Sequence, residues 1–166
     1  MVLNLYVVDS VMVLCAGGAV LSSYGESKRE PIRRRHLVFP GVFALLSAIL
    51  VLAFPMPSDL MDSQFWLILL VCILIGAARG AFLGMAADHY WKLVRIDHGI
   101  DALLGSSAVL VIAVIQFYIE ASTSMENHAE TTFEFVMSVI AGYLFGRSVA
   151  AWFRARSLHH HDLKEV

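Results

Sequence analysis

Four charged residues lie inside or beside long apolar stretches, where a charge must be paired, hydrated or functional. Asp9 lies in the first apolar stretch, Arg79 in the third and Arg147 in the last, while Asp101 stands at the start of the fourth. A charge at membrane depth is costly unless it faces protein or water. Arg79, Arg147, Asp101 and Asp9 are therefore the candidate buried polar network.

The two arginines allow more than one interpretation. Counted at about 1.5 Å per residue from the outer ends of their helices, both lie about 21 to 23 Å deep, level with each other, and Asp101 is the nearest candidate counter-ion. Both could snorkel to the cytoplasmic headgroups. Arg79, Arg147 and Asp101 could instead line an inward-facing cavity as a paired network, or the arginines could contact another subunit.

The composition predicts the elements that would position these charges. Hydrophobic residues make up 58% of the 166 residues and charged residues 16%, and the mean hydropathy is +0.71. These values are typical of an all-α, multi-pass membrane protein. We expect a transmembrane domain over residues 1–156 and a polar cytoplasmic tail over 157–166. The five apolar stretches predict helices over 3–22, 37–56, 65–85, 102–121 and 132–153.

The charges predict the orientation of the helices. With five spans, all twelve Lys and Arg residues fall on one side. Basic residues favour the cytoplasmic side, so we expect the N-terminus outside, the C-terminus in the cytoplasm, and residence in a bacterial inner membrane. Arg33, Arg34 and Arg35 lie in a basic loop between two helices, where they more simply meet anionic lipid headgroups than nucleic acid.

Glycines recur on two of the expected helices. Gly76, Gly80 and Gly84 are spaced by four residues, as are Gly142 and Gly146. Residues four apart share one helix face, and small residues let helix backbones approach closely. The two faces could pack against each other or against the first helix. Short spans with such faces predict association with other membrane-protein subunits or homo-oligomerisation.

Catalytic and cofactor signals are weak. The chain has no GxSxG, Walker or HExxH motif, so we expect no enzyme activity. No cofactor is indicated, and neither cysteine belongs to a CxxC pair. His36, His89 and His98 fall at the cytoplasmic ends of the expected spans and are weak metal candidates. A haem between His36 and His89 is geometrically conceivable.

The connector over residues 88–101 predicts a short cytoplasmic β-hairpin, with a strand, a turn and a second strand within Leu93 to Ile100. Together with Pro31, Pro40 and the Phe54-Pro55-Met56 end of the second helix, this order of elements resembles the CcdC-like small membrane proteins. The resemblance implies a multi-pass bacterial inner-membrane protein loosely linked to cytochrome c maturation. It supplies no catalytic residue.

Three functions are therefore expected, in decreasing order. The first is a non-enzymatic subunit or assembly factor of a larger membrane complex. The second is a small transporter or channel-like protein with a polar path through Asp9, Arg79, Asp101 and Arg147. The third is an interfacial haem-binding redox protein.

Overall fold

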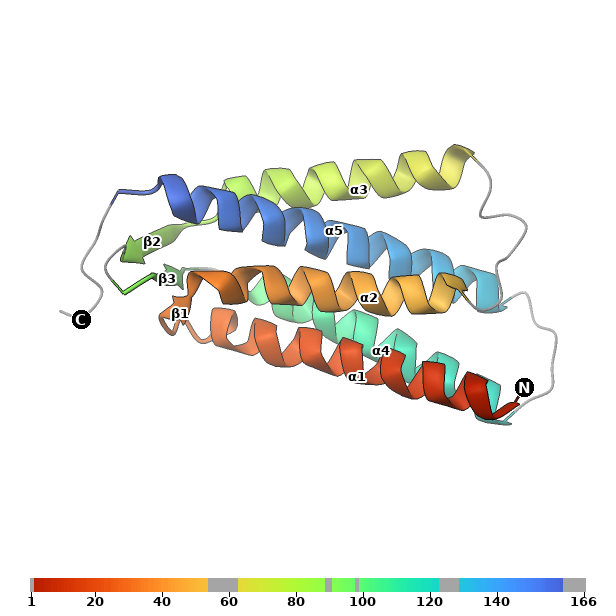
Figure 1. Ribbon diagram of the computed structural model, residues 1–166. Coiled ribbons are helices and arrows are strands. Elements are labelled where there is room, and N and C mark those ends of the chain that lie inside the picture. Colours follow the sequence, from red (N-terminus) through yellow and green to blue (C-terminus); the bar gives the residue numbers. More distant parts are fainter. Residues whose placement is uncertain (1, 54–62, 89–90, 98, 123–128, 160–166) are drawn as a thin grey trace.

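The computed structural model describes residues 2–53, 63–88, 91–97, 99–122 and 129–159. Five α-helices lie side by side in this part of the chain, and a small antiparallel sheet covers one end of them, here called the sheet end (Figure 1). The helices run alternately toward and away from that end. Their bounds are α1 Val2–Ser27, α2 Phe39–Ala53, α3 Ser63–Ala81, α4 Ile100–Ser122 and α5 Ala129–Ser157.

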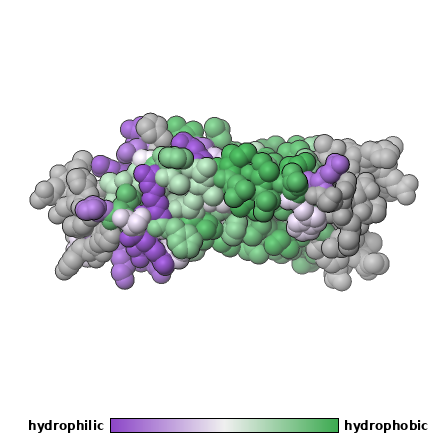
Figure 2. Space-filling model, turned by 90° about the horizontal axis from the view of Figure 1, so that it is seen from above, coloured by the Kyte–Doolittle hydropathy of each residue, from purple (hydrophilic) through white to green (hydrophobic). Residues whose placement is uncertain are grey.

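Four of the helices are long and apolar enough to cross a membrane. The qualifying segments are Val7–Ser27, Gln64–Ala81, Ile100–Ile119 and Phe133–Ser157. The described part of α2 has 15 residues, which rise about 22 Å, less than the roughly 30 Å of a bilayer core. Residues 54–56 of the expected second helix lie outside the described residues. Figure 2 shows an apolar band across the middle of the molecule and hydrophilic residues toward the sheet end.

The helix ends depart from the expected bounds where tertiary contacts decide them. α3 ends at Ala81 rather than residue 85. Arg154 of α5 stops it there, because its Nη1 donates to the carbonyl oxygens of Ala81 and of Leu83, the latter at 2.6 Å. The prediction that Gly84 continues the helical packing face is therefore wrong. Gly84 precedes a strand, and its carbonyl accepts the backbone N–H of Asp97.

The sheet has three short strands in the order β1-β3-β2: β1 Ile32–Arg33, β2 Met85–Asp88 and β3 Leu93–Ile96. The expected hairpin between the third and fourth helices is present, and its strand at the start of Leu93 to Ile100 is β3. The partner expected after the turn is absent from the described residues. β3 pairs backward with β2, in register Ala87↔Val94, and α4 already begins at Ile100. The pairing follows from burial, since Val94 and Ile96 enter an apolar cluster at the sheet end.

Packing is closest between α3 and α5. A Cβ on Gly76 would overlap the carbonyl oxygen of Tyr143, and one on Gly146 would overlap that of Ile73. Gly80 makes a similar approach to the carbonyl oxygen of Arg147, while Gly142 lies against the side chain of Leu69 in the same interface. The glycine faces thus meet each other, and only residues without a side chain permit that backbone contact. On its other sides α5 packs on α2 and α4, while α1 packs on α2 and α4.

Candidate functional site

Arg147 is a fully buried charge inside the bundle. Its side chain is 1% exposed, and its Nη1 donates to Oε2 of Glu26 at 2.9 Å. On the other side, Nε and Nη2 donate to the two carboxylate oxygens of Asp101, at 3.1 and 3.2 Å. This two-pronged geometry is the one in which a guanidinium binds a carboxylate most strongly.

Asp101 joins the second arginine to the first. Its Oδ2 also accepts Nε of Arg79 at 3.1 Å and the hydroxyl of Tyr143 at 3.4 Å. Exposure rises outward, from Arg147 through Asp101 at 22% to Arg79 at 42%. Arg79, Arg147, Glu26 and Asp101 therefore form one cluster with two positive and two negative charges, here called the charge network.

Four local features position the carboxylates of Glu26 and Asp101. α1 runs to Ser27, past the expected end at residue 22, and so carries Glu26 into the bundle. Gly99 lets the loop before α4 lie against α1, because a Cβ there would stand 2.6 Å from the Glu26 carbonyl oxygen. Asp101 lies in the first turn of α4, where the helix dipole favours a negative charge. The Ser23 and Ser106 hydroxyls hydrogen-bond between the same two helices at 2.7 Å.

Asp9 is not part of the charge network, contrary to the sequence-based expectation. It is buried near the start of α1, 8% exposed, and about 25 Å from Glu26 along that helix at about 1.5 Å per residue. Apolar core residues of α1, among them Met12, Ala16 and Ala19, lie between the two levels. Residues far apart along one straight helix cannot share a site.

Sequence reasoning missed Glu26 and Tyr143. Glu26 was assigned to the basic loop because Gly25 and the cations after it indicated the end of the helix. A signal was present: Ala16, Ala19, Ser23 and Glu26 follow one another at spacings of three or four, which places them on one helix face. All four are buried. Nothing comparable marked Tyr143, whose role depends on where Asp101 lies.

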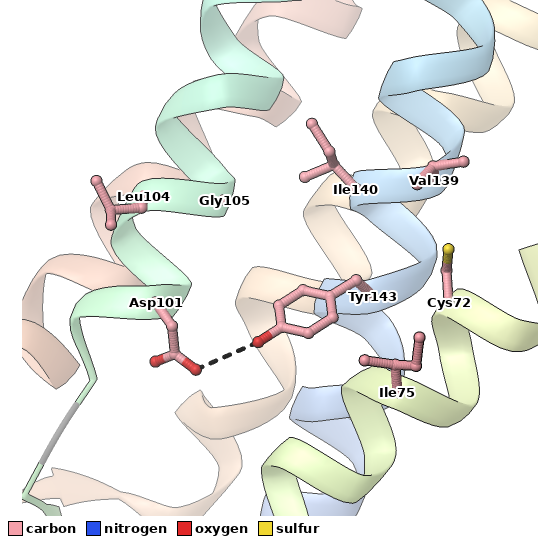
Figure 3. A pocket seen from close by; sticks show the side chains of 8 residues that line it. All are labelled: Cys72, Ile75, Asp101, Leu104, Gly105, Val139, Ile140 and Tyr143. Atoms are coloured by element: carbon pink, nitrogen blue, oxygen red, sulfur yellow. Dashed lines mark hydrogen bonds between the residues drawn. The ribbon is translucent and has the colours of Figure 1, made fainter.

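A pocket of about 450 Å³ lies against the charge network. It is an apolar groove between α3 and α4 with α5 as its floor, here called the α3–α4 groove (Figure 3). The Asp101 carboxylate and the Tyr143 hydroxyl face each other at one end. The remaining lining residues are Cys72, Ile75, Leu104, Gly105, Val139 and Ile140.

The arginines predicted to meet lipid headgroups lie in a different place. Arg33, Arg34 and Arg35 line a second pocket, of about 480 Å³, together with two other cations and two tryptophans. This basic pocket is at the sheet end, formed by the β1 region, the turn before β3 and the end of α5. Its lining residues are Arg33, Arg34, Arg35, Trp91, Lys92, Trp152 and Arg156.

The structure adds little support for the histidines as metal or haem ligands. The His36 ring packs edge-on against Phe39, with centroids 5.0 Å apart. His89 and His98 lie outside the described residues, so the haem pairing does too. Within the described ranges, no three His, Cys, Asp or Glu side chains are grouped to hold a metal ion.

Comparison with known proteins adds no relative. The resemblance to CcdC-like proteins therefore stays a prediction from the order of elements. The chain matches no family model, no curated protein and no solved structure.

Proposed function

We propose that this protein is a non-enzymatic, membrane-embedded subunit or assembly factor that receives apolar side chains of a partner's transmembrane helix in the α3–α4 groove. The groove is the observation that carries the proposal. It is almost entirely apolar, and it lies on the flank of helices that are themselves long and apolar enough to cross a membrane. Concave apolar surfaces of this kind are typical binding sites.

The proposed setting is a bacterial inner membrane, with five spans, the N-terminus outside and the sheet end in the cytoplasm. Basic side chains support this orientation. Those in the described ranges lie in the loop before α2, in the sheet, or in the sheet-end halves of α3 and α5. Cytoplasmic segments are rich in such residues. α2 completes the alternation as the fifth span, and the 3₁₀ turn Arg34–Val38 that precedes it carries basic residues at the sheet end.

The outer face of α3 supports a membrane environment as well. This face carries large apolar side chains that stay exposed, which suits contact with lipid or with a second protein. The most exposed on this helix are Trp66, Leu67, Leu70, Leu74 and Ile75.

The charge network supports the subunit role by fixing one end of the groove. Asp101 is held by two arginines and a tyrosine from α3 and α5. Buried polar groups that pair with one another favour one helix arrangement over its alternatives. A preformed groove costs less ordering when a partner binds. The CcdC-like resemblance would place that partner in cytochrome c maturation.

Transport through Asp9, Arg79, Asp101 and Arg147 is less well supported. Such a path needs polar groups along its length, whereas the levels between Asp9 and the charge network hold an apolar core cluster. A haem-binding role depends on His89, which lies outside the described residues. We therefore favour the subunit role over both alternatives.

The native cysteines allow a direct test, since Cys72 lines the groove and Cys15 lies on α1. A thiol-attached photocrosslinker is placed on Cys72 in a Cys15→Ser chain, and on Cys15 in a Cys72→Ser chain. We expect illumination of native membranes to give a discrete adduct with another membrane protein from Cys72 alone. Mass spectrometry of the adduct identifies the partner.

Two results would count against the proposal. Equal labelling from both cysteines would mean that the groove has no privileged partner. Purification from native membrane as a lone monomer or homodimer, with no adduct to a second protein, would exclude membership of a larger complex.

A further inference from the structure

The basic pocket brings together cations from three distant parts of the chain. Arg33, Arg34 and Arg35 follow from β1, Lys92 ends the turn before β3, and Arg156 lies in the last turn of α5. Antiparallel pairing of β1 with β3 sets Arg33 opposite Leu93, and the Arg34 N–H donates to the Lys92 carbonyl at 3.0 Å. The cluster is thus built by the fold, unlike a run of charges in one loop.

Within the described ranges, none of these five cations forms an ion pair, and no carboxylate is among the residues that line the pocket. Five like charges around one cavity repel one another, and the cavity focuses their field. A bound anion would remove that repulsion.

Two features hold cations at the pocket. The Arg156 guanidinium lies over the Trp152 ring, 3.6 Å from its centroid, an attractive cation–π arrangement that restrains the arginine. Lys92 has a φ of 54°, a left-handed conformation that costs a residue with a Cβ about 1 to 2 kcal/mol. Asparagine adopts this conformation more readily, so the backbone conformation does not explain why this residue is a lysine.

We propose that the basic pocket binds a phosphate ester anion. Guanidinium groups form paired hydrogen bonds with phosphate oxygens, and a lysine adds a mobile point charge. The cavity of about 480 Å³ accommodates a phosphorylated headgroup or a small soluble phosphate ester. Basic pockets on the cytoplasmic side of membrane helices bind anionic headgroups. The inference shares only the membrane setting with the proposed function and does not require a partner in the groove.

The test uses the full chain in a neutral detergent. Binding is followed by tryptophan fluorescence, because Trp91 and Trp152 line the pocket. The probes are short-chain phosphatidylglycerol, glycerol 3-phosphate and, as a zwitterionic control, short-chain phosphatidylcholine. We expect saturable binding of phosphatidylglycerol, weakened by salt, and at least tenfold weaker binding of phosphatidylcholine. Saturation by glycerol 3-phosphate at similar concentration would identify a soluble source of the anion; saturation by the lipid alone would identify a headgroup.

Variants that replace one cation by a neutral residue distinguish binding in the pocket from a general attraction of anions to a basic protein. Lys92→Asn and Arg156→Gln should each weaken phosphatidylglycerol binding about fivefold, as one cation near a membrane surface contributes. Lys92→Asn also lowers the backbone strain at this position, so weaker binding by this variant is not explained by misfolding. Arg95→Gln is the matched control, because Arg95 lies in the same hairpin but does not line the pocket. It should change binding less than about twofold.

Either of two outcomes would overturn the inference. In one, neither phosphatidylglycerol nor glycerol 3-phosphate binds saturably at low salt. In the other, Arg95→Gln weakens binding as much as Lys92→Asn does, which would mean diffuse electrostatic attraction without a site.

Discussion

The charge network and the basic pocket are both rich in arginine and both lie toward the sheet end. In the network the charges balance, whereas in the pocket positive charges are in excess. Inside the bundle, Arg147 is matched by Glu26 and Asp101, and the network has no net charge. At the surface, five cations share a cavity that has no carboxylate among its described lining residues. Burial enforces neutrality, because an unpaired buried charge costs several kcal/mol, whereas exposed excess charge is screened by water and salt.

The difference separates structure from binding. A network whose charges satisfy one another has little left to offer a ligand, and its contribution is to fix α1, α4 and α5 relative to each other. A pocket with surplus charge contributes little to folding and retains its full attraction for an anion. Substitutions in the two regions should therefore differ in what they change, as well as in how much.

The largest effect should come from Arg147→Leu. The substitution leaves the carboxylate of Glu26, whose side chain is fully buried, without compensation. We expect a loss of about 3 to 5 kcal/mol in the free energy of unfolding, measured by denaturant titration in detergent micelles.

A double substitution checks the cause. Arg147→Leu combined with Glu26→Leu removes both charges and should be more stable than Arg147→Leu alone, because no buried charge is left unpaired at that position. If Arg147→Leu alone stays within about 0.5 kcal/mol of the native chain, which is the ordinary range of surface substitutions, the network is not what holds these helices.

Parts of both regions could be predicted from the sequence. The features that were missed depend on tertiary contacts. Apolar stretches located the five helices to within a few residues. Counting residues from the outer helix ends placed Arg79, Asp101 and Arg147 at one level. Glu26 was missed because a glycine and a run of cations resemble a helix end, whereas α1 continues to Ser27 and packs there against Gly99 and Arg147. Gly84 was misassigned because a side chain from α5, Arg154, ends α3.

A smaller effect is expected for Arg79→Leu, the outer member of the charge network. The Arg79 side chain is 42% exposed, so its ion pair with Asp101 is screened, and we expect a loss of less than about 1 kcal/mol that shrinks as salt is added. Thermal melting in detergent measures it. An unchanged melting temperature at low salt would mean that Arg79 snorkels and does not help to hold Asp101.

The smallest effect on stability is expected in the basic pocket. Arg35→Gln removes an exposed cation that has no ion pair within the described residues, so the free energy of unfolding should change by no more than about 0.5 kcal/mol. At low salt, relief of repulsion should make any change stabilising. Destabilisation as large as that of Arg147→Leu would erase the distinction between the two regions.

The contact between α3 and α5 has a consequence for biosynthesis. Among the helices, α3 packs mainly on α5, which the ribosome makes after the other four, whereas α1, α2 and α4 can already pack on one another. In the proposed membrane setting, the glycine face of α3 therefore has no partner until α5 has been inserted. A chain that stops before residue 129 should assemble α1, α2 and α4 and leave α3 undocked, open to quality-control proteases or to the helices of other proteins.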